Sequence, residues 1–92
     1  MAQKNYVYII FSQKDGRFFY GHTYHPQRTL LTHNKGSSAY TRKFRPWKLF
    51  ATKVVENRSE AIRMEMELKK MRKKDEFLKY IITNDFEIDG EK

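Results

Sequence analysis

Cysteine is absent from this chain of 92 residues, which has only four glycines and two prolines. Without cysteine, neither a disulfide framework nor a thiolate metal site can form, so we expect no disulfide partner and a reducing compartment. No apolar run approaches the ~20 residues that span a bilayer, and the first residues turn polar too soon for a secretory signal. These absences favour a single cytoplasmic domain over residues 1–92, with no membrane partner.

Acidic residues are missing from a long central segment. Between Gly16 and Val55 there is no Asp or Glu, whereas the same segment carries eight Lys and Arg residues. The rest of the chain has 11 basic and 11 acidic residues, so the net charge of +8 belongs to this segment alone. Positive charge concentrated in this way is typical of proteins that bind a polyanion. We therefore expect a nucleic-acid partner, and an interaction protein with another kind of partner fits the charge poorly.

Hydrophobic patterning predicts a small α+β domain. Strands are expected over 6–12, 17–23 and 47–55, the first two joined by an Asp-Gly turn. Helices are expected over 26–33, 58–74 and 75–83. The predicted order is β-β-α-β-α-α, a three-stranded, largely antiparallel sheet flanked by helices, with residues 36–46 as a polar connection.

One carboxylate of the long predicted helix lies outside its charged face. On a helical wheel, Ala61, Met64 and Leu68 form an apolar stripe, and Glu65 falls beside it. A charge near the core needs a partner, which a salt bridge to Lys69 or to an arginine elsewhere would supply. Alternatively, Glu65 is a ligand for a hard divalent cation, because Mg²⁺ is often held by one or two carboxylates. Position alone does not choose between these interpretations.

Three sequence blocks together resemble the GIY-YIG nuclease domain. They are YVYII in the first predicted strand, FYGHT in the second, and the lone glutamate of the long helix. The resemblance covers residues 5–75 and is greatest to the small stand-alone members of that superfamily, such as the UPF0213 proteins. Residues 76–92 are expected to add a helix and a tail. The resemblance implies metal-dependent hydrolysis of a nucleic-acid phosphodiester, with DNA as the expected substrate.

The resemblance also implies roles for individual residues. Tyr8 matches the tyrosine of the first motif, and Gly21 matches the glycine of the second, where a phosphate or a neighbouring backbone can come close. Glu65 matches the glutamate that binds one metal ion, expected here to be Mg²⁺ or Mn²⁺. His33 matches a position that is often His or Tyr, with a role in proton transfer or phosphate contact.

Two positions depart from the family pattern. The tyrosine of the second motif falls on Phe19, and the arginine of the first helix falls on Thr29. A phenylalanine cannot move a proton and a threonine cannot neutralise a phosphate, and losses of this kind commonly cost ~10²–10⁴ in rate. The alternative function is therefore a nucleic-acid-binding module whose catalytic site is degenerate.

Neighbouring residues offer two ways to compensate for these departures. A β-bulge near Gly21 would turn Tyr20 toward the site, and Arg28 or Arg42 would reach the phosphate with a long side chain. The predicted catalytic residues are then Tyr8, Tyr20, Arg28, His33 and Glu65.

Basic and aromatic residues alternate after the first predicted helix, as suits a surface on which nucleic-acid bases stack. The predicted nucleic-acid contacts are Gly21, His22, Lys35, Tyr40, Arg42, Lys43 and Arg45. A zinc site is not expected, because the spacing of the three histidines fits no common zinc pattern and no cysteine joins them. The oligomeric state is not fixed by these patterns.

Overall fold

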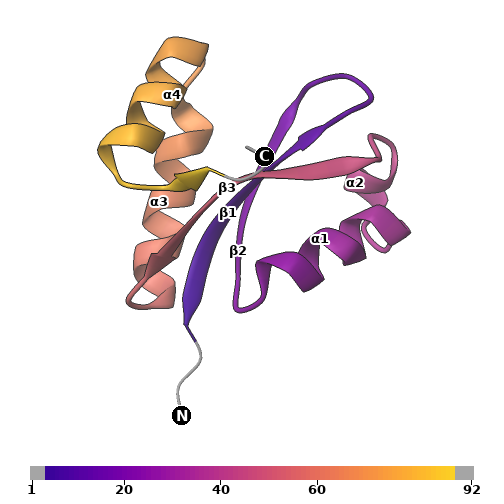
Figure 1. Cartoon of the computed structure of the whole chain (residues 1–92), viewed down its shortest axis with the longest axis horizontal. Helices are drawn as coiled ribbons and strands as arrows, with labels where there is room; N and C mark the ends of the chain where they lie inside the picture. Colours follow the sequence, from indigo (N-terminus) through magenta and orange to yellow (C-terminus); the bar gives the residue numbers. More distant parts are fainter. Residues whose placement is uncertain (1–3, 89–92) are drawn as a thin grey trace.

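The protein is an α+β domain built on one antiparallel sheet, seen in a computed structural model that describes residues 4–88 (Figure 1). In chain order its elements are β1 (Asn5–Ser12), β2 (Phe18–Thr23), α1 (Pro26–Lys35), α2 (Ala39–Arg42), β3 (Trp47–Val55), α3 (Arg58–Lys70), α4 (Lys74–Thr83) and β4 (Glu87–Ile88). The strand order is β2-β1-β3-β4, so β1 and β3 are central and β2 forms one edge. The predicted fold class is confirmed.

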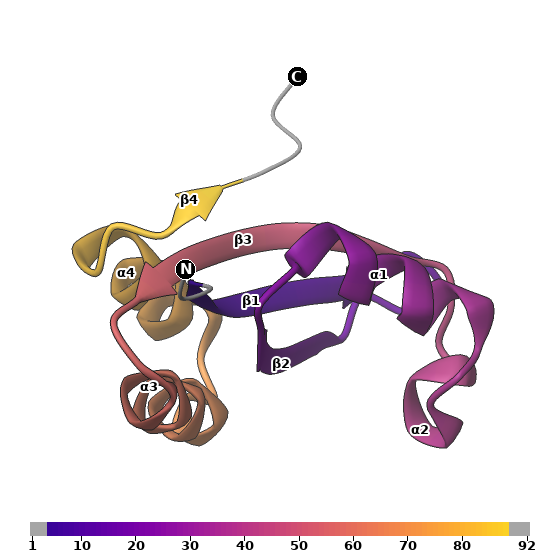
Figure 2. The ribbon, with the colours of Figure 1, turned by 90° about the horizontal axis from the view of Figure 1, so that it is seen from below.

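The helices divide between the two faces of the sheet (Figures 1 and 2). On one face, called here the α1 face, Tyr8, Ile10, Trp47 and Leu49 form a buried cluster beneath α1 and α2. On the other, called the α3 face, residues of β1 and β3 pack against α3 and α4; this core comprises Val7, Ile9, Ala51, Val55, Ala61, Met64, Leu68, Phe77, Ile81 and Phe86. Alternation of side chains along β1 sends Val7 and Ile9 to one face and Tyr8 and Ile10 to the other.

Three helix ends follow from local sequence. Pro26 occupies the first turn of α1, where its missing N–H leaves no hydrogen bond unmade. Gly36 closes the same helix in the left-handed region, with φ of 87°. Asn57 caps α3 by accepting a 2.9 Å hydrogen bond from the backbone N–H of Glu60.

The structure corrects three details of the predicted element order. The polar connection contains the four-residue helix α2, and a fourth strand, β4, pairs with β3 at Ala51 and Thr52. Both elements are too short for a hydrophobic period to reveal them. The long helix ends at Lys70 rather than residue 74, because Met71 adopts an extended conformation before α4 begins. No helix within residues 4–88 is long and apolar enough to cross a membrane.

Candidate functional site

Tyr8 and Gly21 lie opposite each other in the β1–β2 ladder, on the α1 face. The Tyr8 ring passes directly over the glycine: a Cβ added at position 21 would lie 2.6 Å from the tyrosine hydroxyl oxygen. Real Cβ atoms do not make contacts this short, so a side chain at position 21 would displace the ring. The structure thus places the Tyr8 side chain at Gly21, where the sequence predicted the approach of a phosphate or a neighbouring backbone.

His33, on α1, connects Tyr8 to helix α2 through buried hydrogen bonds. Its Nε2 lies 3.0 Å from the Tyr8 hydroxyl, and its Nδ1 lies 2.9 Å from Oγ1 of Thr41. Thr41 is itself fixed, because its carbonyl accepts a 2.8 Å hydrogen bond from the Trp47 indole N–H. Sequence reasoning missed Thr41, since its contribution depends on the unpredicted helix α2.

Burial keeps both members of the Tyr8–His33 pair neutral at pH 7. Burial, and secondarily the negative charge of Glu65, raise the pKa of Tyr8 to about 12. Burial lowers the pKa of His33, because the charged imidazolium loses its hydration. The phenol therefore retains its proton, and the imidazole has a lone pair available to accept one.

Glu65 extends from α3 to the edge strand β2, where its Oε2 contacts Nδ1 of His22. Its Oε1 lies 3.6 Å from Nζ of Lys69, so the predicted salt bridge to that lysine is present, with an unpredicted histidine as a second partner. The Glu65 side chain keeps 13% of its surface exposed, and the lysine side chain 58%. An exposed lysine at this distance is readily displaced, which leaves one carboxylate oxygen accessible.

The donor set at Glu65 suits a divalent cation held by few protein ligands. Among residues 4–88, no three His, Asp or Glu side chains gather as a complete metal cage. A single carboxylate does fit Mg²⁺ or Mn²⁺, whose remaining positions are commonly filled by water and substrate phosphate. The imidazole of His22, which contacts this carboxylate, is a kind of ligand that Zn²⁺ accepts more readily than Mg²⁺ or Mn²⁺.

The two positions that depart from the family pattern carry structural contacts instead. Phe19 lies on the α1 face with its ring edge against His33, at a centroid distance of 5.3 Å. Thr29 faces β2, and its Oγ1 lies 2.7 Å from Oγ1 of Thr23. The substitutions thus retain the packing of the site and omit one phenol and one guanidinium.

Tyr20 and Arg28 do not join Tyr8 and His33. The β1–β2 register runs without interruption from Phe18 to Thr23, so the bulge expected near Gly21 is absent, and Tyr20 points to the α3 face. There its ring lies 5.9 Å from that of Phe77. Arg28 is exposed on α1, rotated ~100° from Thr29. The prediction that a bulge turns Tyr20 toward Tyr8 was wrong, because continuous pairing with β1 fixes the face to which each residue of β2 points.

Several predicted nucleic-acid contacts gather at the end of the sheet occupied by α2. The Arg17 guanidinium lies 3.7 Å from the centroid of the Phe44 ring and donates a 3.3 Å hydrogen bond to the Tyr40 hydroxyl. Tyr40 is 48% exposed, whereas Arg42 is tied back to the Gly36 carbonyl at 3.2 Å. The remaining members, Lys35, Lys43 and Arg45, are exposed. The patch therefore offers one aromatic ring and several cations to solvent.

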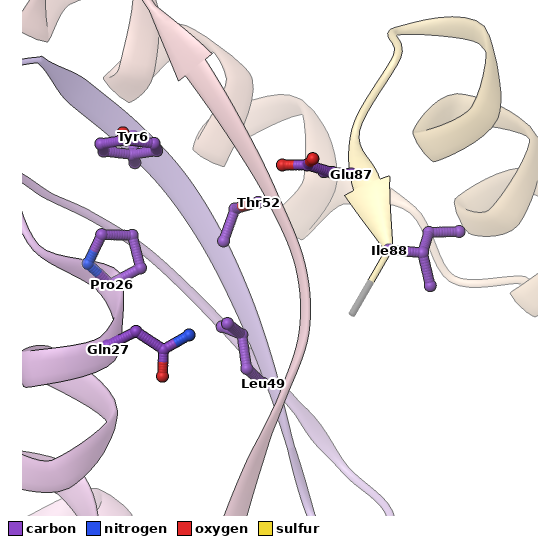
Figure 3. Close-up of a pocket in the computed structure, with 7 residues that line it drawn as sticks. All are labelled: Tyr6, Pro26, Gln27, Leu49, Thr52, Glu87 and Ile88. Atoms are coloured by element: carbon purple, nitrogen blue, oxygen red, sulfur yellow. The ribbon is translucent and has the colours of Figure 1, made fainter. Parts of the chain in front are cut away.

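Two pockets near the sheet differ in charge. One, of about 350 Å³, is lined by Tyr6, Pro26, Gln27, Leu49, Thr52, Glu87 and Ile88 (Figure 3). Within residues 4–88 its only charged lining residue is the acidic Glu87, which disfavours a phosphate. The other, of about 260 Å³, is lined by Asn5, His22, Thr23, Tyr24 and Arg58. It carries an arginine and no carboxylate, and it borders Glu65 through His22.

Known proteins match this chain over most of its length. A family model described as the GIY-YIG catalytic domain matches residues 4–84. A UPF0213 protein of Enterococcus faecalis is 40% identical over 82 residues, covering 84% of this chain and 92% of that protein. A UPF0213 protein of Halalkalibacterium halodurans is 38% identical over 77 residues, covering 80% and 81%. The solution NMR structure of a UPF0213 protein from Bacillus halodurans superposes with a TM-score of 0.54 at 29% identity, covering 89% and 87% of the chains.

Proposed function

Because the chain belongs to the GIY-YIG catalytic domain family, as its sequence blocks predict, we propose that it is an endonuclease that hydrolyses DNA phosphodiesters with one Mg²⁺ or Mn²⁺ ion. The family supports a nuclease-type function; the DNA substrate and the ion are the proposal. One observation carries it: Tyr8, hydrogen-bonded to His33, lies over Gly21, and Glu65 contacts His22, the next residue of the same edge strand.

In this proposal Glu65 holds the metal ion, and Lys69 moves away to free the carboxylate oxygen. When bound, such an ion polarises the phosphoryl oxygens and stabilises the leaving oxygen. His22, in contact with the other oxygen, orients the carboxylate. This arrangement needs no second acidic ligand, in keeping with the lack of one beside Glu65 within residues 4–88.

Tyr8 and His33 handle the proton of the attacking water. The water donates to the Tyr8 oxygen while the Tyr8 O–H donates to Nε2 of His33, so a proton leaves the water as another enters the imidazole. In this proposal Nδ1–H of His33 donates to the Thr41 hydroxyl, 2.9 Å away, and Nε2 carries the lone pair that accepts the proton. A phenol with a pKa near 12 needs this neutral imidazole, because it does not ionise by itself at pH 7.

A second candidate function, a nucleic-acid-binding module with little or no cleavage, is favoured by one pair of residues. Phe19 and Thr29 stand where the family has a tyrosine and an arginine, and both are committed to contacts within the protein. Each omission lowers the expected rate by ~10²–10³. The charge that binds nucleic acid is kept in either case.

The test is a cleavage assay on labelled duplex, single-stranded and branched DNA with Mg²⁺, Mn²⁺ or EDTA. Glu65→Gln removes the proposed ligand and keeps the side-chain volume. Glu67→Gln is the matched control, because it makes the same charge change on the same helix, ~200° around its axis. We expect metal-dependent cleavage in the wild type and in Glu67→Gln, and a loss of at least about 10²-fold in Glu65→Gln.

Cleavage that survives Glu65→Gln or EDTA would contradict the nuclease proposal. Salt-sensitive DNA binding without cleavage in the wild type would instead establish the binding module. The same panel with RNA strands tests the choice of DNA. The cytoplasmic location stays a prediction.

A further inference from the structure

The pocket lined by Asn5, His22, Thr23, Tyr24 and Arg58, called here the Arg58 pocket, has the chemistry of an oxyanion site. Every lining side chain carries at least one hydrogen-bond donor or a hydroxyl, and none is acidic. Arg58 adds a planar guanidinium, which matches the oxygens of a phosphate group by paired hydrogen bonds. At about 260 Å³, the pocket has room for a phosphate with part of its sugar.

Two of its residues tie the Arg58 pocket to the candidate catalytic site. His22 lines the pocket and contacts Glu65 with Nδ1, so its other ring nitrogen is left for a ligand. Thr23 also lines the pocket and contacts Thr29, which stands where the family has its arginine. The pocket therefore lies between the carboxylate proposed to hold the metal and the place where a cation is missing.

Arg58 forms no salt bridge with another residue in the described range 4–88. The salt bridges there engage Arg17 with Asp15, Arg63 with Glu60 and Glu67, and both His22 and Lys69 with Glu65. Arg58 is exposed at the start of α3, and it is the only charged residue that lines the pocket. An arginine in a recess of neutral donors is suited to an anionic ligand rather than to a structural ion pair.

We propose that the Arg58 pocket binds one backbone phosphate of a nucleic acid, and that Arg58 supplies the cation that Thr29 cannot. This inference rests on the proposed function only for the identity of the ligand. It does not require cleavage, because a binding module would use the same phosphate contact. Arg58 also offsets the repulsion that a phosphate meets beside Glu65.

The experiment measures how the affinity for a fluorescent single-stranded oligothymidylate depends on salt, by fluorescence anisotropy. Arg58→Gln removes the proposed phosphate contact. Arg72→Gln is the control, because it removes the same charge from an exposed arginine just beyond the other end of α3, ~20 Å along the helix. We expect Arg58→Gln to reduce the slope of log affinity against log salt by about 0.7, with little change in Arg72→Gln.

A double variant that moves the positive charge from position 58 to position 29 then tests the link to Thr29. Adding Thr29→Arg to Arg58→Gln places a guanidinium at the family's usual position and should restore the salt slope and the affinity. Equal slopes in Arg58→Gln and Arg72→Gln would overturn the proposal, and so would a wild type that binds no oligothymidylate. An Arg58-dependent slope without any cleavage would keep the Arg58 pocket and overturn the nuclease, so the two failures are distinguishable.

Discussion

The two faces of the sheet bury their residues by different means. On the α3 face, Phe18, Phe50 and Phe77 pack ring against ring, with centroids 4.6 to 6.0 Å apart and no polar partner among them. On the α1 face, buried Tyr8 and His33 are held by directed hydrogen bonds. Apolar packing tolerates many side chains of similar volume, whereas a buried hydrogen-bonded chain requires particular residues.

A pair of hydrogen bonds between the Asn34 side chain and the Trp47 backbone is a further polar contact on the α1 face. The Asn34 amide accepts from the Trp47 backbone N–H at 2.6 Å and donates to its carbonyl at 3.0 Å, as a strand neighbour would. The side chain of Ser12 donates to the Phe44 carbonyl at 2.7 Å in the same region. Polar side chains therefore hold α1 and α2 on the sheet, and both helices lie within the segment from Gly16 to Val55 that carries the whole positive excess. The α1 face is thus held by directed polar contacts and the α3 face by apolar packing.

Phe77→Ala should have the largest effect on stability and separates the two faces most clearly. Phe77 is buried against Phe18, Phe50 and Tyr20, so its truncation leaves a cavity in the α3 face and should lower the free energy of unfolding by about 3–5 kcal/mol. Urea denaturation measures the loss. Phe44→Ala, on the partly exposed α1 side, is the comparison and should cost less. Equal losses would show that the faces contribute alike.

Gly21→Ala should disturb the α1 face without touching the apolar core. The added methyl group meets the Tyr8 ring, so we expect a loss of about 1–3 kcal/mol together with a break in the Tyr8–His33 hydrogen bond. Gly16→Ala is the control: φ of 80° strains alanine there, but no atom lies within 4 Å of the new methyl group. Gly16→Ala should lose stability yet keep the hydrogen bond, which ¹H NMR of the Tyr8 hydroxyl and His33 ring would reveal.

The elements that sequence predicts well are those whose own patterning is long enough to be seen. Alternation in β1, the proline and glycine limits of α1, and the apolar stripe of α3 each spans several residues, and all three elements form, although α3 ends four residues before its predicted end. Helix α2 and strand β4 have four and two residues, and they form only because the rest of the fold positions them. Local pattern cannot reveal elements of this kind.

The residues of the candidate site also divide into those that the sequence predicts and those that only the fold reveals. Tyr8, His33 and Glu65 were predicted from motif positions; the structure joins Tyr8 to His33 by a hydrogen bond and places Glu65 against His22, the neighbour of Gly21 in β2. The contacts of Thr41 and Arg58 arise from residues distant in sequence, and no local signal marks either one. Tyr20 shows the opposite error, because its phenol suits the chemistry but strand pairing turns it to the other face. Residue type suggested the chemistry of the site, and strand pairing decided which side chains face it.

Thr41→Val tests whether the hydroxyl positions His33 or merely fills space. Valine has nearly the same shape but cannot bond to Nδ1, so we expect a stability loss of about 1 kcal/mol and a slower cleavage step with unchanged DNA affinity. Thr41→Ser keeps the hydroxyl and should restore the rate despite the lost methyl group. If the serine variant is as slow as the valine variant, packing rather than the hydrogen bond accounts for the effect.

The smallest expected effect is the pH dependence contributed by His33. Its pKa is lowered by burial below the ordinary value of 6.5, so as pH falls below 6.5 the unfolded chain binds a proton that the folded protein does not. The contribution of His33 to stability is therefore complete above pH 6.5 and declines as pH falls toward its folded pKa. An NMR titration of the His33 ring should give a midpoint below 6.5, and His33→Gln should flatten the decline in urea stability between pH 7.5 and 5. A midpoint above 6.5 would mean that the α1 face holds this imidazole charged, which would remove the neutral acceptor that the proposed proton transfer from Tyr8 requires.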